Sequence, residues 1–358
     1  MSSPVLSDSG FTHLLSFYCP LPAEVCPETE RMRERTLQWA QRFDLGQGDA
    51  QRTRMLALNS SVFSAHMYPH ATGELGQALS DYGAWAWIPN DLTGSGRPVG
   101  DILVALGRWE SIMCFPDSSP ESASPEDFDL LDLPLREVFA RLRDLMTAVQ
   151  WERFRSEQQL WLYQMAREAA LLERGVTLSV NDYLVMRIGA AGGFAASGYI
   201  DAVEGIELSE RQWARRDVRA ATGAAVLVGA LDNDRYSYYR EHNLPVKKQN
   251  LFHALLGEHP GDSVEEAVTK AVAIRDRLMS LYLRLREQIL QDAPQDLHRY
   301  MTGLDLVVSG NINFGMKTAR YLLPDSPYTV SRVDKPSDPT PDPLPYPALA
   351  WWWNQVRC

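Results

Sequence analysis

The stretch that most constrains the fold is residues 221–231, ATGAAVLVGAL, which is apolar on every face of a helix. A helix that is apolar all round is buried in the middle of a protein. The polar segment 232–241, DNDRYSYYRE, follows at once. If the helix continues at about 100° per residue, four polar side chains of this segment fall within an arc of roughly 100°. They are Asn233, Ser237, Arg240 and Glu241.

This polar face combines an amide oxygen, a hydroxyl, a carboxylate and a guanidinium. Oxygen donors suit a hard cation such as Mg²⁺, which keeps several waters or substrate phosphates among its ligands. An arginine beside a cation site indicates a ligand that carries phosphate. The alternative interpretation is a solvated helix end, whose polar side chains cap the helix and face water. The segment by itself leaves both interpretations open.

Most of the remaining chain also has the pattern of helices. Leu, Ala, Arg, Glu and Gln recur at helical spacing, most clearly in residues 30–43, 136–149, 152–173 and 264–291. Sustained alternation of apolar and polar residues, which marks a strand, is hard to find. We therefore expect an all-α protein in which strands are minor or absent.

Charge narrows the range of partners. The 358 residues include 35 Lys+Arg and 46 Asp+Glu, which gives a formal net charge of −11. Nucleic-acid backbones are held by summed positive charge, so a general nucleic-acid binder is excluded. The four cysteines are scattered without zinc-ligand spacing, and neither a secretory leader nor a membrane span is apparent. These features predict a cytoplasmic protein that binds anions only at a local site.

One arginine, Arg187, stands in the otherwise apolar stretch 183–194, YLVMRIGAAGGF. A buried guanidinium without a partner costs on the order of several kcal/mol, so Arg187 should have an anionic ligand, unless it reaches the surface or pairs with a core carboxylate. Gly189, Gly192 and Gly193 each weaken a helix by up to about 1 kcal/mol. We expect a break just after Arg187 that exposes backbone carbonyls.

The helical part of the chain closes with residues 310–321, GNINFGMKTARY. Arg320 offers a planar fork of donors and Tyr321 a single donor, which suits a cluster of diphosphate oxygens. Prolines crowd the following residues and lead to three consecutive tryptophans at 351–353. We expect one domain over residues 1–322 and a tail over 323–358. The prolines predict an extended or disordered tail, whereas the tryptophans favour a tail that folds back on the body or on a partner.

Together these residues resemble the bacterial class I terpene synthases. Residues 233–241 match the family pattern N-D-x-x-S-x-x-R/K-E completely. Arg187 is similar to the arginine with which that family senses diphosphate, and Arg320 and Tyr321 are similar to its terminal Arg-Tyr pair. The likeness extends over residues 10–322 and leaves only the tail outside it.

The resemblance implies an α-helical bundle around a central apolar cavity. It implies a Mg²⁺-dependent terpene cyclase, with three Mg²⁺ ions expected and Mn²⁺ as an alternative. Such an enzyme ionises an acyclic isoprenyl diphosphate and cyclises the carbocation to a hydrocarbon or an alcohol, with release of diphosphate. Farnesyl diphosphate is the first choice of substrate and geranylgeranyl diphosphate the second. The protein would be a monomer or a homodimer.

The resemblance also implies roles for single residues. The metal ligands would be Asn90, Asp91, Asn233, Ser237 and Glu241. The residues that bind the substrate would be Arg187, Arg240, Arg320 and Tyr321. Arg187, Ala191 and Phe314 would take part in catalysis. Ala191 would place carbonyl dipoles and open volume beside the cation, and an aromatic face such as that of Phe314 stabilises a cation by about 0.5–2 kcal/mol.

The first metal motif departs from the family pattern. An aspartate-rich D-D-x-x-D or D-D-x-x-x-E is expected where this chain has Asn90 and Asp91, and Gly94 and Ser95 replace the later acid. An amide donates an oxygen without a charge, so this side of the metal cluster should bind Mg²⁺ more weakly. Two alternatives therefore stay open. One is an enzyme that releases mainly linear products, and the other is a non-catalytic protein that binds an isoprenoid or a partner.

Overall fold

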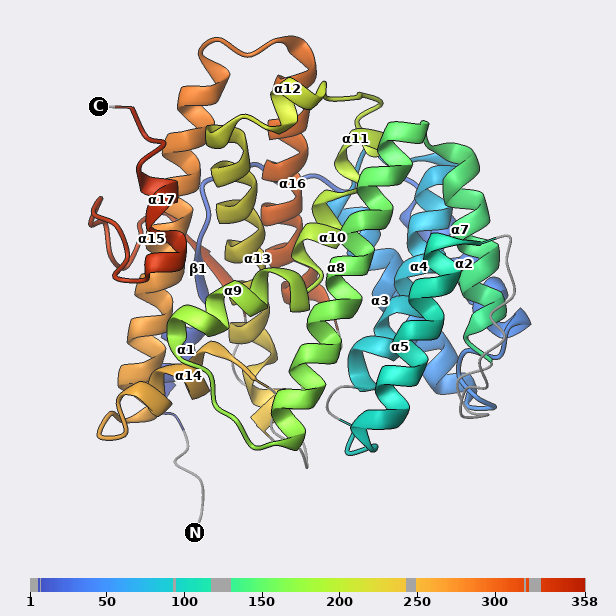
Figure 1. The fold of residues 1–358 in the computed structure, drawn as a ribbon, viewed down its shortest axis with the longest axis horizontal. Coiled ribbons are helices and arrows are strands. Elements are labelled where there is room, and N and C mark those ends of the chain that lie inside the picture. Colours follow the sequence, from blue (N-terminus) through green and yellow to red (C-terminus); the bar gives the residue numbers. More distant parts are fainter. Residues whose placement is uncertain are drawn as a thin grey trace.

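The structure is a computed structural model that describes residues 6, 8–92, 95–116, 130–242, 249–318, 320–321 and 330–357, without the side chains of 8, 9, 11 and 239–242. The helices are α1 (Asp8–Leu14), α2 (Thr29–Arg42), α3 (Ala50–Met67), α4 (Gly73–Leu92), α5 (Val99–Cys114), α7 (Asp132–Leu145), α8 (Ala148–Glu173), α9 (Val180–Ala190), α10 (Gly193–Ser197), α11 (Ile200–Val203), α12 (Glu210–Trp213), α13 (Arg216–His242), α14 (Leu251–Glu258), α15 (Val264–Leu290), α16 (Gln295–Lys317) and α17 (Pro347–Trp353). Two short strands, β1 (Ser16–Tyr18) and β2 (Ser331–Val333), accompany them. The expectation of an all-α fold is confirmed (Figure 1).

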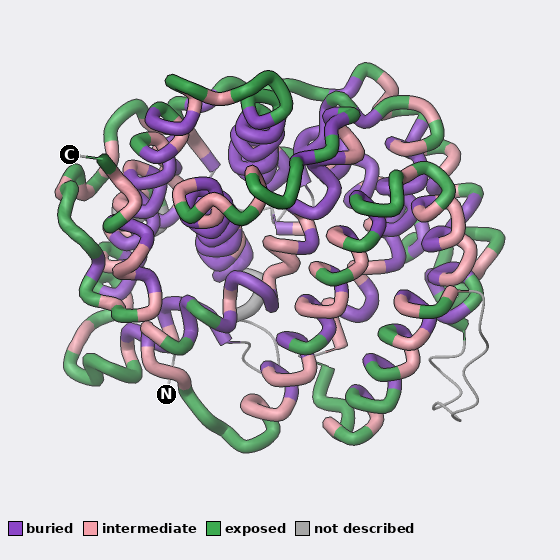
Figure 2. The backbone as a smooth tube through the Cα atoms, turned by 45° about the horizontal axis from the view of Figure 1, so that its top comes forward, coloured by how far each residue is buried: buried purple, intermediate pink, exposed green. Residues whose placement is uncertain are grey.

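Helix α13 contains the apolar stretch and lies inside the bundle. Ala221, Ala224, Leu227 and Val228 are fully buried, because α9, α10, α15 and α16 pack around the helix. Figure 2 shows the same arrangement, with largely buried backbone in the middle and helices around it that are buried on one side. The predicted helix in the middle of the protein is therefore confirmed. Among the helices in the described part of the chain, none has the length and hydropathy to cross a membrane.

Helix boundaries follow local capping signals. The segments predicted at 30–43 and 264–291 are α2 and α15. The segment predicted at 136–149 spans two helices, because Thr147 begins α8 with a capping box. Its side chain accepts a hydrogen bond from the Gln150 backbone N–H, while the Gln150 side chain accepts one from the Thr147 N–H. The chain therefore turns between α7 and α8 where helical spacing alone predicted one helix.

The described part of the tail, residues 330–357, folds back on the body. Strands β1 and β2 pair in parallel, with Phe17 opposite Arg332. The Arg332 guanidinium donates to the carbonyls of Leu21 (3.0 Å) and Ser309 (2.8 Å), which fastens the tail to the N-terminal segment and to α16. Helix α17 then packs on α9 and α13 and buries Trp352. This is the arrangement that the tryptophans favoured; the division of the chain at residue 322 stays a prediction.

Candidate active site

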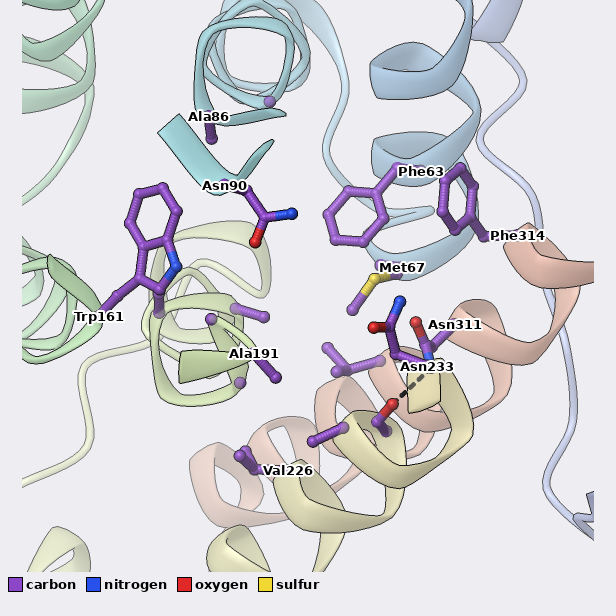
Figure 3. A pocket seen from close by; sticks show the side chains of 18 of the residues that line it. Phe63, Met67, Ala86, Asn90, Trp161, Ala191, Val226, Asn233, Asn311 and Phe314 are labelled. Atoms are coloured by element: carbon purple, nitrogen blue, oxygen red, sulfur yellow. Dashed lines mark hydrogen bonds between the residues drawn. The ribbon is translucent and has the colours of Figure 1, made fainter. Parts of the chain in front are cut away.

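A cavity of about 170 Å³ lies between α3, α4, α8, α10, α13 and α16 (Figure 3). Along α4 its lining extends from Leu79 to Asn90, and eleven positions at 1.5 Å per residue span about 16 Å. Along α13 the lining extends from Ala225 to Tyr236, over the same distance. The cavity that the resemblance implied is therefore present, and it is elongated along two helices.

Aromatic rings form much of the cavity wall. The Phe314 ring centroid lies 5.3 Å from that of Phe63 and 5.9 Å from that of Trp87. These three rings come from α16, α3 and α4, and Figure 3 shows Phe63 and Phe314 side by side at one side of the pocket. A second aromatic group consists of Tyr68, Tyr82 and Tyr199. Phe314 thus lies in the wall, as its assigned role requires.

Small residues make room between these rings. The glycines and alanines that line the cavity are Gly83, Ala86, Ala191, Gly192, Gly193, Ala195, Ala196, Ala225, Gly229 and Ala230. They come from α4, from α13 and from the region around α10. A larger side chain at these positions would fill space that a ligand could use, so the cavity depends on this composition.

Asn233 and Ser237 lie one turn apart near the end of α13. Asn233 lines the cavity, and the buried Ser237 hydroxyl has no hydrogen-bond partner among the described residues. A buried hydroxyl without a partner costs about 1–3 kcal/mol, which a bound ligand would offset. Arg240 and Glu241 belong to the same helix, but their side chains lie outside the described residues. Their roles stay predictions.

Arg187 pairs with a core carboxylate and also lines the cavity. Its Nη2 lies 2.7 Å from Asp234 Oδ1 and donates to Asn233 Oδ1 at 2.8 Å. Asp234 accepts further hydrogen bonds from the Tyr183 hydroxyl (2.5 Å) and from the Leu251 N–H (3.0 Å). Burial raises the pKa of Asp234, and the charge of Arg187 opposes that shift. This network holds the Arg187 guanidinium in place at the cavity wall.

Asn90 and Asp91 occupy different places at the end of α4. The Asn90 side chain points into the pocket between Trp161 and Phe63 (Figure 3). Asp91 instead binds Arg320, with Oδ1 2.5 Å from Nη2 and Oδ2 3.3 Å from Nη1. The assignment of Asp91 as a metal ligand stays a prediction.

Arg320 and Tyr321 bring the end of the helical body to the same place. The Arg320 Cζ atom lies 4.6 Å from the Trp87 ring centroid, and Tyr321 lines the cavity beside it. Burial alone would lower the pKa of Arg320, but interactions with Tyr321 and Asp91 outweigh burial and raise the pKa above its ordinary value. Arg320 is therefore a permanent cation. With Arg187, Asn233 and Tyr321 it forms the polar end of the cavity.

The predicted break after Arg187 is confirmed. Helix α9 ends at Ala190, and Gly192 takes the left-handed conformation (φ 69°), which costs glycine little. Ala191 lies at this break and lines the cavity, as its assigned role requires. At Gly193, an added Cβ would lie 2.3 Å from Val226 Cγ1, so only glycine lets α10 approach α13 this closely.

Two other charged residues of segment 232–241 fasten α13 to the rest of the protein. Asp232 forms a fully buried ion pair with Arg275, with oxygen to nitrogen distances of 2.6 and 2.9 Å. Arg235 is also buried and donates to the backbone carbonyls of Leu14 (2.9 Å) and Ser16 (2.6 Å). Neither side chain lines the cavity. They position the helix that carries Asn233 and Ser237.

Four residues that contact Arg187 or Asn233, directly or through one another, were not predicted from the sequence. They are Tyr183, Asp234, Tyr236 and Asn311. Asp234 carried a signal, because it is the acidic residue that directly follows Asn233 in the matched motif. The other three are a tyrosine or an asparagine in a helix, and no local pattern separates such residues from ordinary packing residues.

The donors at the polar end fit a hard divalent cation. Within the part of the chain that the structure describes, no cluster of three or more His, Cys, Asp and Glu could hold a metal ion. The oxygen donors present are the amides of Asn90 and Asn233 and the unpartnered hydroxyl of Ser237. Mg²⁺ accepts such oxygen ligands and keeps water or phosphate in its remaining positions, whereas zinc favours nitrogen and sulfur.

Comparison with known proteins agrees with this geometry. Residues 81–280 match the family described as terpene synthase family 2, C-terminal metal binding. Diterpene cyclase DtcycB from Streptomyces sp is 38% identical over 345 residues, which cover 96% of this chain and 98% of that protein. Bonnadiene synthase from Allokutzneria albata is 29% identical and covers 94% of this chain and 96% of its own.

Solved structures show the same fold. The crystal structure of the SVS_A2 protein, from ancestral sequence reconstruction, has a TM-score of 0.81 at 28% identity and covers 95% of this chain and 98% of its own. The family match takes in the end of α4, Arg187 and the polar end of α13. The chain therefore belongs to terpene synthase family 2, uses a divalent metal and is a terpene cyclase.

Proposed function

We propose that this protein is a Mg²⁺-dependent diterpene cyclase that ionises geranylgeranyl diphosphate and cyclises the resulting cation. The observation that carries the proposal is an elongated apolar cavity whose charged groups lie together. Of the described residues that line it, only Arg187 and Arg320 are charged, and both contact residues of the metal motifs. A diphosphate at this end would leave the rest of the cavity to a hydrocarbon chain.

The length of the substrate rests on the similarity to DtcycB, whose name describes a diterpene cyclase. The many glycines and alanines of the lining support it, because they leave room for a longer chain. Farnesyl diphosphate, the first expectation from the sequence, is the alternative substrate.

We assign the diphosphate to Arg187, Arg320 and Tyr321, with Arg240 added from the end of α13. Hydrogen bonds from arginine to phosphate are charge-assisted and stronger than those between neutral groups. Donors fixed in advance around a leaving oxygen are usually the largest single contribution to catalysis. The leaving diphosphate would therefore meet the guanidinium groups of Arg187 and Arg320, whose contacts with Asn233 and Asp91 already set their positions.

Asn90, Asn233, Ser237 and Glu241 would hold the metal, with three Mg²⁺ ions expected from the resemblance. When bound, Mg²⁺ supplies Lewis-acid stabilisation of the diphosphate oxygens. Asp91 remains a candidate ligand, and its contact with Arg320 gives it a second role in orienting that guanidinium.

The hydrocarbon part of the reaction belongs to the cavity wall. Cleavage of the carbon–oxygen bond sends the electron pair to the diphosphate and leaves an allyl cation. Aromatic faces such as those of Phe314, Phe63 and Trp87 stabilise a nearby cation by about 0.5–2 kcal/mol each. Backbone carbonyls at Ala191 would add dipoles. The apolar wall would keep water away from the cation until a proton is lost to give a hydrocarbon, or until water adds to give an alcohol.

The test is incubation of the purified protein with Mg²⁺ and geranyl, farnesyl or geranylgeranyl diphosphate, followed by gas chromatography and mass spectrometry of the extract. We expect a cyclic C20 product from geranylgeranyl diphosphate and none in the presence of excess EDTA. A cyclic product from farnesyl diphosphate alone would refute the substrate. Linear products throughout would refute cyclisation, and binding without turnover would refute catalysis.

A further inference from the structure

Asn233 can serve a metal only if its amide has the correct orientation. The oxygen of an amide is a ligand for a hard cation, whereas its NH₂ group is a donor and cannot bind one. The two ends of the amide have nearly the same shape, so packing alone does not distinguish them. A hydrogen-bond network that distinguishes donors from acceptors is needed to set the orientation.

Such a network starts at the backbone carbonyl of Gly229, which can only accept. Asn311 Nδ2 donates to this carbonyl at 3.0 Å, so Asn311 Oδ1 faces the other way. The Tyr236 hydroxyl donates its single proton to Asn311 Oδ1 at 2.9 Å. The Tyr236 oxygen can then only accept, and Asn233 Nδ2 donates to it at 3.2 Å. The direction of each bond follows from the one before it.

The same count of donors and acceptors assigns the other hydrogen bonds of the Asn233 amide. Its second N–H donates to the Tyr321 hydroxyl oxygen at 3.2 Å, so both donors of the amide are used. Because Tyr321 accepts this bond, its own proton is available to a ligand oxygen. Asn233 Oδ1 accepts one bond from Arg187 and keeps a second lone pair. Figure 3 shows Asn233 and Asn311 side by side, with Asn90 across the pocket.

Packing keeps Tyr236, the central residue of this hydrogen-bond network, in place. Tyr236 is buried, and its ring lies directly on the backbone of α16, where a Cβ on Gly315 would be 2.7 Å from Tyr236 Cδ1. The ring centroid of Tyr321 lies 4.7 Å from that of Tyr236. The Tyr236 hydroxyl therefore cannot swing to another partner without repacking α13 on α16.

We propose that Tyr236 and Asn311 are positioning residues that hold the Asn233 amide with its oxygen toward the metal and the Tyr321 proton toward the diphosphate. The proposal rests on the proposed function, because it concerns the same metal and diphosphate site. Arg187 holds the Asn233 oxygen as well, but a bound diphosphate would compete for that guanidinium. The chain through Tyr236 acts on the opposite end of the amide and stays in place when diphosphate binds.

The test measures binding rather than turnover. The melting temperature of the protein is recorded against Mg²⁺ concentration at a fixed, saturating concentration of inorganic diphosphate, because a ligand that binds the native state raises that temperature. In Tyr236→Phe, which loses only the hydroxyl, we expect the half-saturating Mg²⁺ concentration to rise about tenfold, the effect of losing one well-formed hydrogen bond. Asn311→Ala leaves Tyr236 in place and should shift the midpoint in the same direction.

A matched control separates positioning from general destabilisation. Tyr300 is another fully buried tyrosine of the bundle, and its hydroxyl pairs with Thr222 Oγ1 at 3.0 Å, away from the cavity lining. Tyr300→Phe should lower the melting temperature without Mg²⁺ but leave the Mg²⁺ midpoint unchanged. An equal midpoint shift in Tyr300→Phe and Tyr236→Phe would overturn the proposal.

A carboxylate at position 233 gives the decisive comparison, because it offers oxygen at both ends and needs no orientation. In an Asn233→Asp background, we expect Tyr236→Phe to shift the midpoint by no more than about twofold, so that the two substitutions are coupled. Equal shifts in both backgrounds would refute the orienting role alone. Absence of any Mg²⁺-dependent stabilisation in the unmodified protein would instead refute the metal and diphosphate site itself.

Discussion

At the residue scale, the roles of Asp91 and Arg320 depend on each other, because the two side chains form an ion pair. They lie 229 positions apart in the chain, yet both Arg320 terminal nitrogens reach the Asp91 carboxylate. The Asp91 side chain is 42% exposed, so solvent screens the pair and its contribution to stability is small. The pair instead orients Arg320, because the Asp91 carboxylate holds the guanidinium against the Trp87 ring.

This pairing predicts that the two residues are not independent in catalysis. We expect Asp91→Ala and Arg320→Ala each to lower kcat/KM by about 10- to 100-fold, and the double variant to be no slower than Arg320→Ala alone. Steady-state kinetics on the substrate that is turned over would measure the coupling. Losses that multiply in the double variant would mean that Asp91 acts separately from Arg320, as a metal ligand would.

Single residues were predictable where a motif carried them. Arg187, Asn233, Arg320 and Tyr321 were predicted to act together, and all four line one cavity. The hydrogen-bond network through Asn311 and Tyr236 could not be predicted, because it depends on how α13 and α16 pack. A hydrogen-bond direction is set by the neighbours in space, and the sequence contains no periodic signal for it.

At the scale of elements, the break between α9 and α10 shapes the cavity. Ala191, Gly192 and Gly193 line the cavity in succession, which an unbroken helix would not allow because successive residues point to different faces. The sequence predicted this break from its glycines. By contrast, it predicted one helix over residues 136–149, where the capping box at Thr147 starts a new one.

The break predicts different outcomes for two glycines with the same backbone conformation. Gly192 and Gly175 both have positive φ, 69° and 63°, and each change to Ala should cost about 1 kcal/mol of unfolding free energy. Gly192→Ala should in addition alter the product distribution, because an added Cβ lies 3.8 Å from the Trp161 ring in the cavity wall. Gly175→Ala has open space and should not alter it.

Denaturant unfolding and product analysis of the two variants would check this prediction. A changed product distribution in both, or in neither, would show that the backbone at Gly192 does not shape the cavity.

For the whole molecule, the described part of the tail, residues 330–357, packs on the helical body. Trp352 is buried against α13, where a Cβ on Gly223 would lie 2.7 Å from its ring. Prolines alone predicted an extended chain. Here the burial of large aromatic surface outweighs the effect of the prolines. Composition does not show where on the body such side chains pack.

This packing predicts that two neighbouring tryptophans, Trp351 and Trp352, contribute very differently to the free energy of unfolding. Trp352→Ala should lower the free energy of unfolding by about 3–5 kcal/mol, the usual cost of removing a large buried side chain. Trp351 is only partly buried, and its ring lies 5.8 Å from Arg216 Cζ, so Trp351→Ala should cost about 1 kcal/mol or less. Guanidinium unfolding curves would measure both. Equal, small losses would show that α17 does not unfold together with the body.

The parallel pairing of β1 with β2 has a consequence for the order of events during synthesis. Residues 16–18 are made before helices α2 to α16, whereas their partners at 331–333 are made after them. In the meantime the segment whose carbonyls hold Arg235 has no neighbouring strand, although α13 is already complete. The helix that carries Asn233 and Ser237 therefore reaches its final anchoring only after residue 333 has been translated, and a chain that stops before this strand would contain the motif without its full support.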